Sequence, residues 1–108
     1  MYEPLKVELD RQDGTIRLAV AGELDLATVP ELEAQLPVPA PGETLVMDLR
    51  ELAFIDSSGI RVLMRLDTDS RDQGWALVVV RPRANVQRVL DLVRLGERVR
   101  LVDEPSEV

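Results

Sequence analysis

The sequence predicts an α/β fold, with a mostly parallel sheet of about five strands covered by helices. Residues 44–49 and 75–80 are short apolar runs with little alternation, which is typical of strands covered on both faces. Segments with helical periodicity lie between and after these runs, so strands and helices alternate along the chain. Such alternation builds right-handed βα units, and we expect only the first strand to run antiparallel to its neighbour.

The first two expected strands form a hairpin. Residues 6–11 alternate apolar and charged side chains, which indicates a half-exposed strand. Asp13-Gly14 then predicts a tight turn. Residues 15–21 form the second strand, which we expect Gly22 to end.

A short helix should follow the hairpin and end at Leu36. Thr28 and Glu31 have the spacing of a capping box, in which the hydroxyl and the carboxylate each bond the backbone of the other residue. Residues 37–42 read Pro-Val-Pro-Ala-Pro-Gly and can form neither a helix nor a paired strand. We expect them to be a stiff surface connection within the domain.

Two longer helices should pack on the sheet. Residues 58–71 and 84–94 each place their apolar side chains on one stripe. Residues 99–102 then form the last strand, and the acidic residues 103–108 should be a frayed tail. The whole chain, residues 1–108, is expected to be a single domain.

Composition argues against several classes of function. The net charge is −7, from 20 acidic and 13 basic residues, and no dense basic run is present, so we expect neither nucleic acid nor a membrane as partner. No apolar run has the length of a signal peptide or membrane span, and cysteine is absent, which favours the cytoplasm. The absence of histidine and cysteine excludes a structural zinc site, and we expect no metal and no cofactor.

Two polar loops should leave the carboxyl ends of strands, where α/β folds place their functional crevice. The first is Gly-Glu-Leu-Asp at 22–25, and the second is Asp-Ser-Ser-Gly at 56–59. Asp56, Ser57 and Ser58 are all favourable N-cap residues, but a helix needs only one cap. The sequence therefore leaves open whether the second loop only starts a helix or also displays a hydroxyl for chemistry.

Gly59 would weaken the first turn of the helix, so it indicates either the close approach of a partner or tight packing on the sheet. A hydroxyl at this helix N-terminus could accept a phosphate, which the free N–H groups would favour. Arg61 lies one turn beyond Ser57 and would either pair with that phosphate or remain an ordinary solvated residue. In the second case the phosphate would change the surface on which a partner docks, because its charge opposes the loss of water that binding requires.

Enzyme functions find little support in the sequence. A serine hydrolase needs a base, and without histidine the one candidate other than a carboxylate is Lys6, which precedes the first strand. Asp48 ends a strand as in a phosphoaspartate receiver, but the acidic pair and the late lysine of a receiver are missing. No phosphate-binding glycine loop is present. A carboxylate enzyme or nucleotide hydrolase is therefore the weakest hypothesis, and we expect no enzyme.

Three stretches of the chain resemble the STAS domain, in particular the stand-alone bacterial anti-sigma factor antagonists. AGELDLATVPEL at 21–32 is similar to the family's G-E-L-D loop and following helix. LVMDLRELAFIDSSGIRVLMRL at 45–66 is similar to its strand, its D-S-S/T-G-[LI] loop and its helix, and WALVVVRPRANVQRVLDLVRL at 75–95 to a later strand, loop and helix. The resemblance covers nearly the whole chain and implies the STAS fold.

The resemblance implies a partner-switching cycle. The unmodified protein would bind an anti-sigma factor, which is also a serine kinase of the histidine-kinase-like ATPase fold, and so release a sigma factor. Phosphorylation of Ser57, with Ser58 as second choice, would break the complex, and a serine phosphatase would restore it. We expect the protein to be a monomer or a weak dimer. The alternative is a STAS scaffold subunit of a stress-sensing or transporter-associated complex.

The same resemblance places partner contacts on both loops and on the helix that follows the second. Asp56 would order the serine loop, while Asp25 would either contact the partner or serve as a turn residue. Leu26 and Met64 would be either apolar contacts or partial core. Arg61 stands where relatives often have a small residue, so partner choice stays open. The expected partner-binding residues are Glu23, Asp25, Leu26, Thr28, Asp56, Ser57, Ser58, Gly59, Arg61 and Met64.

Overall fold

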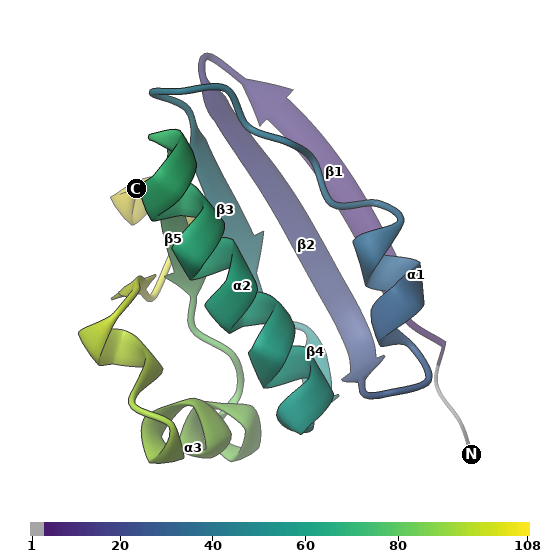
Figure 1. Ribbon diagram of the computed structural model, residues 1–108. Coiled ribbons are helices and arrows are strands. Elements are labelled where there is room, and N and C mark those ends of the chain that lie inside the picture. The colour runs from purple at the N-terminus through teal and green to yellow at the C-terminus, as the bar shows by residue number, and fades with distance from the viewer. Residues whose placement is uncertain (1–3) are drawn as a thin grey trace.

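The computed structural model describes residues 4–108 as a mixed sheet with helices packed mainly on one face (Figure 1). Residues 1–3 of the single domain expected over 1–108 lie outside the described residues. The elements are β1 (Lys6–Gln12), β2 (Thr15–Leu24), α1 (Val29–Glu33), β3 (Thr44–Asp48), β4 (Leu52–Ile55), α2 (Ser57–Gln73), β5 (Ala76–Val80), α3 (Ala84–Leu92), the 3-10 helix η1 (Leu95–Glu97), β6 (Arg100–Val102) and the 3-10 helix η2 (Pro105–Glu107).

The strand order confirms the predicted fold class. The sheet runs β1-β2-β3-β5-β6, and β4 pairs with β2 outside this path. The pair β1 and β2 is antiparallel, whereas the other pairs are parallel. The fold is therefore a mostly parallel sheet with an antiparallel first strand.

The sheet has six strands instead of the expected five, because β4 is a strand of its own. The backbone turns after β3, where the N–H of Leu52 donates to the carbonyl of Leu49 at 3.0 Å. β3 then pairs with the first half of the ten-residue β2, and β4 with its last residues. The turn holds Arg50 and Glu51, neither of which is a residue type that marks a turn in a sequence.

Gly22 does not end β2, contrary to the sequence prediction. The strand continues to Leu24, with a register shift between Gly22 and Glu23. Gly22 has φ +101°, and a Cβ added there would lie 2.7 Å from the carbonyl oxygen of Pro4. Glycine is needed for this irregularity, which takes Glu23 and Leu24 onward to the carboxyl edge of the sheet.

The predicted capping box at Thr28 and Glu31 is wrong. The Thr28 hydroxyl donates to the carbonyl of Glu23 at 2.8 Å and accepts from the N–H of Asp25 at 2.9 Å. It therefore holds the preceding loop together and makes no cap bond to α1. The helix α1 is correspondingly short and ends at Glu33, before the expected Leu36.

The main core lies between the sheet and α2, which crosses one face of it (Figure 1). The predicted apolar stripe of α2 is buried, as are the alternate β2 residues Ile16, Leu18 and Val20. Full burial of each such side chain stabilises the fold by about 1.5–3 kcal/mol. Gly74 ends α2 in the left-handed conformation, with φ 78°. This packing fixes the position of the first turn of α2 at the carboxyl edge of the sheet.

The acidic tail is folded and not frayed. Residues 105–107 form η2, and the Glu107 carboxylate accepts from the N–H groups of Asp103 and Glu104 at 2.6 and 2.9 Å.

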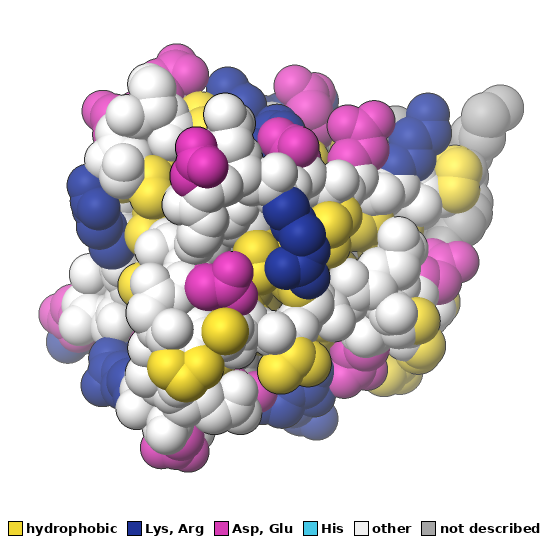
Figure 2. All heavy atoms as spheres, turned by 90° about the horizontal axis from the view of Figure 1, so that it is seen from above, with side chains coloured by type: hydrophobic (Ala, Val, Ile, Leu, Met, Phe, Trp, Pro, Cys, Tyr) yellow, Lys and Arg dark blue, Asp and Glu magenta, His cyan; other side chains and the backbone are white. Residues whose placement is uncertain are grey.

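A separate cluster of four buried valines lies on β3, β5 and β6. Figure 2 shows the end of the molecule that is uppermost in Figure 1, where hydrophobic side chains are interrupted by charges of both signs.

Candidate functional site

Two loops leave the sheet side by side at its carboxyl edge, as predicted. Leu24 at the end of β2 is in register with Ile55 at the end of β4. Just beyond them, the N–H of Asp56 donates to the carbonyl of Leu24 at 3.2 Å. The loop 25–28 and the start of α2 therefore begin as neighbours at one end of the molecule (Figure 1).

Asp56 is the N-cap of α2 and holds the serine loop in place. Its backbone is extended, and its Oδ1 accepts from the N–H groups of Ser58 and Gly59 at 2.8 and 3.3 Å. Such a cap contributes about 1 kcal/mol to helix stability. The Asp56 carboxylate thus caps the helix, and the hydroxyls of Ser57 and Ser58 are not needed as caps.

Ser57 is the first residue of α2, and it is exposed. Ser58 is half-buried. Neither hydroxyl makes a hydrogen bond to any of residues 4–108. The Ser57 hydroxyl is therefore presented to solvent on a loop that a different residue, Asp56, keeps ordered.

Tight packing on the sheet accounts for the glycine at position 59. It is buried, and a Cβ added there would lie 2.7 Å from Cγ1 of Ile55 and 2.9 Å from Cγ of Leu24. Glycine lets the first turn of α2 lie directly on the ends of β2 and β4. This is the packing alternative of the sequence analysis, and a contact between Gly59 and a partner stays a prediction.

The 25–28 loop is held by its own side chains. Asp25 Oδ1 accepts from the N–H groups of Ala27 and Thr28 at 3.0 and 3.1 Å, which is the turn role that the sequence left open. Thr28 is completely buried and has no side-chain surface to offer a partner. Thr28 therefore supports the loop from inside, which corrects the expectation of a direct contact, whereas Asp25 keeps part of its surface exposed.

The remaining predicted contact residues differ in exposure. Leu26 is 77% exposed and is not core. Arg61 is exposed and forms no ion pair within residues 4–108. Met64 is half-buried and packs against the core, and Glu23 is half-buried at the end of β2. Of these four residues, Leu26 thus offers an exposed apolar side chain on the loop and Arg61 an exposed cation on α2.

Phe54 is a candidate contact that the sequence analysis missed. It is 45% exposed and is in register with Glu23, three residues before Ser57. In the sequence it reads as part of an apolar strand end, like its neighbour Ile55, which is buried. A regular period-2 strand would place Leu52 and Phe54 on one face, so the signal for its exposure lies in the strand pairing and not in the local pattern.

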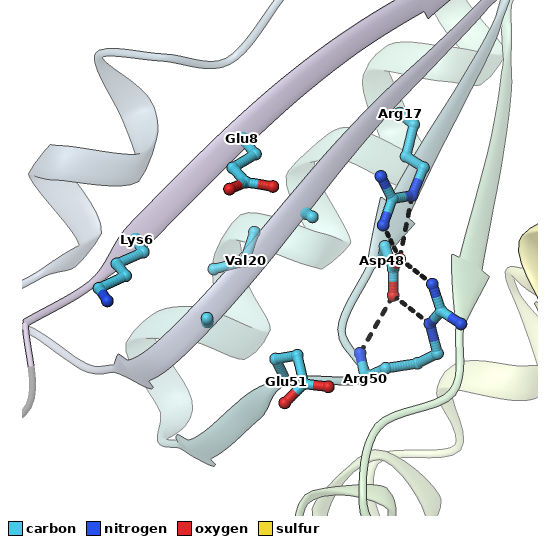
Figure 3. A pocket seen from close by; sticks show the side chains of 9 residues that line it. Lys6, Glu8, Arg17, Val20, Asp48, Arg50 and Glu51 are labelled. Carbon is cyan, nitrogen blue, oxygen red and sulfur yellow. Dashed lines mark hydrogen bonds and ion pairs between the residues drawn. The ribbon is translucent and has the colours of Figure 1, made fainter.

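A second polar cluster lies on the face of the sheet away from α2 (Figure 3). Asp48 is 3% exposed there, and its Oδ2 lies 2.6 Å from Nη2 of Arg17 and 2.8 Å from Nη2 of Arg50. The three residues border a pocket of about 380 Å³, which Ala19 and Ala21 also line. Burial raises the pKa of the Asp48 carboxyl, but the hydrogen bonds from Arg50 and Arg17 outweigh burial and lower that pKa below its usual value.

Asp48 is therefore an ionised, fully paired side chain and not a phosphate acceptor. Its Oδ1 also accepts from the backbone N–H and Nε of Arg50 at 3.2 and 2.9 Å, so both oxygens have partners.

Within residues 4–108, no three acidic side chains gather into a group that could hold a metal ion. Over the same residues, no helix is long and apolar enough to cross a membrane.

Comparison with known proteins decides the family. The family model described as "Mlab, STAS domain" matches residues 7–103. The chain belongs to the STAS domain family. This STAS domain is 25% identical over 94 residues to the anti-sigma-B factor antagonist of Bacillus subtilis, covering 86% of each chain.

Solved structures show the same fold. A crystal structure of an anti-sigma factor antagonist from Mycobacterium paratuberculosis superimposes with a TM-score of 0.73 at 24% identity, covering 99% of this chain and 94% of that one. The anti-sigma factor antagonist SpoIIAA in its unphosphorylated form gives a TM-score of 0.69 at 22% identity, covering 94% of this chain and 91% of that one. The predicted resemblance to the STAS family and its fold is confirmed.

Proposed function

We propose that this STAS domain is an anti-sigma factor antagonist whose binding is controlled by phosphorylation of Ser57. The observation that supports the proposal most directly is the exposed Ser57 hydroxyl on a loop held by Asp56. Proteins named as anti-sigma factor antagonists are similar to the chain over most of its length. In the unmodified state, the chain binds an anti-sigma factor and so frees a sigma factor.

The partner in this proposal is also a serine kinase of the histidine-kinase-like ATPase fold. It transfers the γ-phosphoryl group of ATP to Ser57 Oγ: the bond between the γ-phosphorus and its bridging oxygen breaks, ADP leaves, and the hydroxyl proton passes to a base of the kinase as the new ester bond forms. A separate serine phosphatase hydrolyses the ester and restores the binding form. The chain itself needs no catalytic group for either step, because both enzymes act on its exposed hydroxyl.

Phosphorylation acts on the surface and leaves the fold intact. A phosphate adds about −1.5 to −2 charge and three strong acceptor oxygens at the start of α2. The loop does not depend on Ser57 for its shape, because Asp56 Oδ1 holds the N–H groups of Ser58 and Gly59. The dianion therefore changes which surface can dock there, and a cost of about 3 kcal/mol weakens the complex by more than roughly a hundredfold.

The test is phosphoryl transfer by the anti-sigma factor kinase purified from the source cell. Incubation with the kinase and labelled ATP should add one phosphate to the wild-type chain and none to Ser57→Ala. Ser58→Ala is the matched control, because Ser58 is the adjacent hydroxyl and should leave the label unchanged. Label that persists on Ser57→Ala would contradict the assignment.

A second measurement separates the switch from a permanent assembly. The variant Ser57→Asp places a negative charge at the same corner and should weaken binding of the anti-sigma factor. A complex that forms equally well with Ser57→Asp and with phosphorylated protein would instead indicate a STAS scaffold subunit of a stress-sensing or transporter-associated complex.

A further inference from the structure

The exposure of Phe54 has a specific structural cause. In the pairing of β4 with β2, Leu52 is the partner of Gly22 and Phe54 is the partner of Glu23, so Ala53 has no partner. One extra residue on β4 is a β-bulge, which reverses the side-chain alternation of the residues after it. Leu52 and Ile55 are both buried as a result, while Phe54 projects from the opposite face.

A side chain of α3 holds this bulge. Asn85 Nδ2 donates to the carbonyl oxygen of Ala53 at 3.0 Å, across 32 positions of sequence. The carbonyl of the unpaired residue is thereby satisfied from outside the sheet. The bulge is thus a supported feature of the fold, and Asn85 is the residue positioned to keep Phe54 turned outward.

Phe54 and Leu26 are continuous with the loops of the proposed site. Leu26 follows β2 by two residues and Phe54 precedes Asp56 by two, and the two strand ends are joined by the bond from Asp56 N–H to the Leu24 carbonyl. Both side chains are large, apolar and exposed, and aromatic residues are enriched among the contacts that dominate binding energy.

We infer that Phe54 is an aromatic anchor for the anti-sigma factor, aimed by the bulge at Ala53, with Leu26 as a second apolar contact. The partner surface that fits them is an apolar pocket deep enough for a phenyl ring. This inference rests on the proposed function. It extends the binding surface from the loops and α2 to the edge strand β4 and the sheet face that α2 leaves uncovered.

The chain offers closely matched control residues. Leu9 in β1 is 47% exposed, against 45% for Phe54, and Leu92 at the end of α3 is 78% exposed, against 77% for Leu26. Both controls lie outside the two loops and β4. Replacing them by alanine removes similar apolar surface without touching the proposed contacts.

The experiment is calorimetric titration of each unphosphorylated variant with the purified anti-sigma factor kinase. Phe54→Ala should raise Kd at least tenfold and Leu26→Ala about threefold or more, while Leu9→Ala and Leu92→Ala stay within twofold of wild type. Phe54→Tyr should retain most of the affinity. Thermal unfolding of each variant shows that the fold is kept, as expected for exposed positions.

Asn85→Ala tests the positioning step. It should weaken binding less than Phe54→Ala, and in the Phe54→Ala background it should cause little further loss, because both changes act on one side chain. A benzophenone amino acid at position 54 should cross-link to the kinase, whereas one at position 9 should not.

The possible failures are distinguishable. If the kinase binds Phe54→Ala as tightly as wild type, or position 54 gives no cross-link, the anchor is refuted while the proposed function stands. If the anti-sigma factor binds without phosphorylating Ser57, the phosphoswitch fails, and the titrations still decide on Phe54. If no anti-sigma factor binds the wild-type chain, both proposals are overturned.

Discussion

Asp48 and Asp56 both lie at the carboxyl end of a parallel strand, yet their carboxylates serve different purposes. Asp48, at the end of β3, is buried and accepts bonds from the side chains of Arg17 and Arg50. Asp56, directly after β4, accepts only from backbone N–H groups in the first turn of α2. The Asp48 carboxylate links side chains on the face of the sheet away from α2, and the Asp56 carboxylate fixes the shape of a loop.

The difference fits the proposed phosphoswitch, in which stability and regulation depend on separate residues. In the cluster of Asp48, Arg17 and Arg50, called here the Asp48 cluster, both carboxylate oxygens accept from arginine side chains. Neither oxygen is therefore free to react or to bind another group. In the Asp56 loop the structural task falls to the carboxylate, and the neighbouring Ser57 hydroxyl stays exposed. A modification at Ser57 can therefore alter the surface without dismantling the fold.

The largest effect on stability should come from the Asp48 cluster. Asp48→Ala leaves Arg17 and Arg50 without their carboxylate, and breaking a fully buried pair typically costs 3–5 kcal/mol. The two arginine side chains are 35% and 39% exposed, so solvent reduces the loss to about 2–3 kcal/mol. Urea unfolding measures this loss, and binding of the anti-sigma factor by folded Asp48→Ala should be unchanged. A weakened complex would show that Asp48 also supports the binding surface.

The ion pairs of Asp48 should also make the free energy of unfolding depend on pH. The pKa of Asp48 is lower in the folded chain than in the unfolded one, so acid favours the unfolded state, which binds the proton more readily. The contribution of Asp48 is fully present above about pH 4, the ordinary range of an aspartate, and is lost as pH falls through the lower folded pKa. The difference in unfolding free energy between wild type and Asp48→Asn should therefore shrink below that pH. A constant difference would show that the ion pairs contribute nothing.

Asp56→Ala should have a smaller effect on stability, about 1 kcal/mol, because it removes one N-cap. Unlike Asp48→Ala, it should also weaken the anti-sigma factor complex and slow labelling of Ser57, since the loop loses its order. Asp72→Ala, an exposed acid near the end of α2, is the control and should change stability by less than about 0.5 kcal/mol. Unchanged labelling in Asp56→Ala would contradict the role of Asp56.

The smallest effect on stability should come from Glu104, an exposed residue that pairs with Arg50 of the Asp48 cluster. Its carboxylate lies 3.4 Å from Nη1 of Arg50 and is 63% exposed. Exposed ion pairs contribute little, so Glu104→Gln should lower the unfolding free energy by less than about 0.5 kcal/mol. A loss as large as that of Asp48→Ala would show that burial does not set the strength of this cluster.

Apart from β4, the order of strands and helices could be predicted from local sequence, as could the loop with the Asp56 cap and the serine hydroxyls. Apolar runs marked β3 and β5, and Asp56 and Ser57 stand directly before a helical stripe. These features depend on residues that are adjacent in the chain or one helical turn apart, which is where periodicity and capping rules apply.

What the sequence did not predict depends on pairing between distant segments. The bulge that exposes Phe54 exists only because β4 aligns with β2, and Asn85 reaches it from α3. The Thr28 hydroxyl bonds back to Glu23 instead of capping α1, since the loop folds around it. Tight packing was one of two alternatives for Gly59, and the contact with Leu24 that supports it joins residues 35 positions apart in the chain. None of these contacts leaves a periodic signal in the sequence.

Phosphate on Ser57 is expected to change binding and not folding. The direct measurement compares unmodified protein with protein that contains phosphoserine at position 57, using calorimetric titration with the anti-sigma factor and urea unfolding of the free chain. We predict that Kd rises by more than about a hundredfold while the unfolding free energy stays within about 1 kcal/mol. Equal affinities of the two forms would show that phosphate does not control binding, and a phosphorylated chain that loses its fold would show that it acts on folding instead.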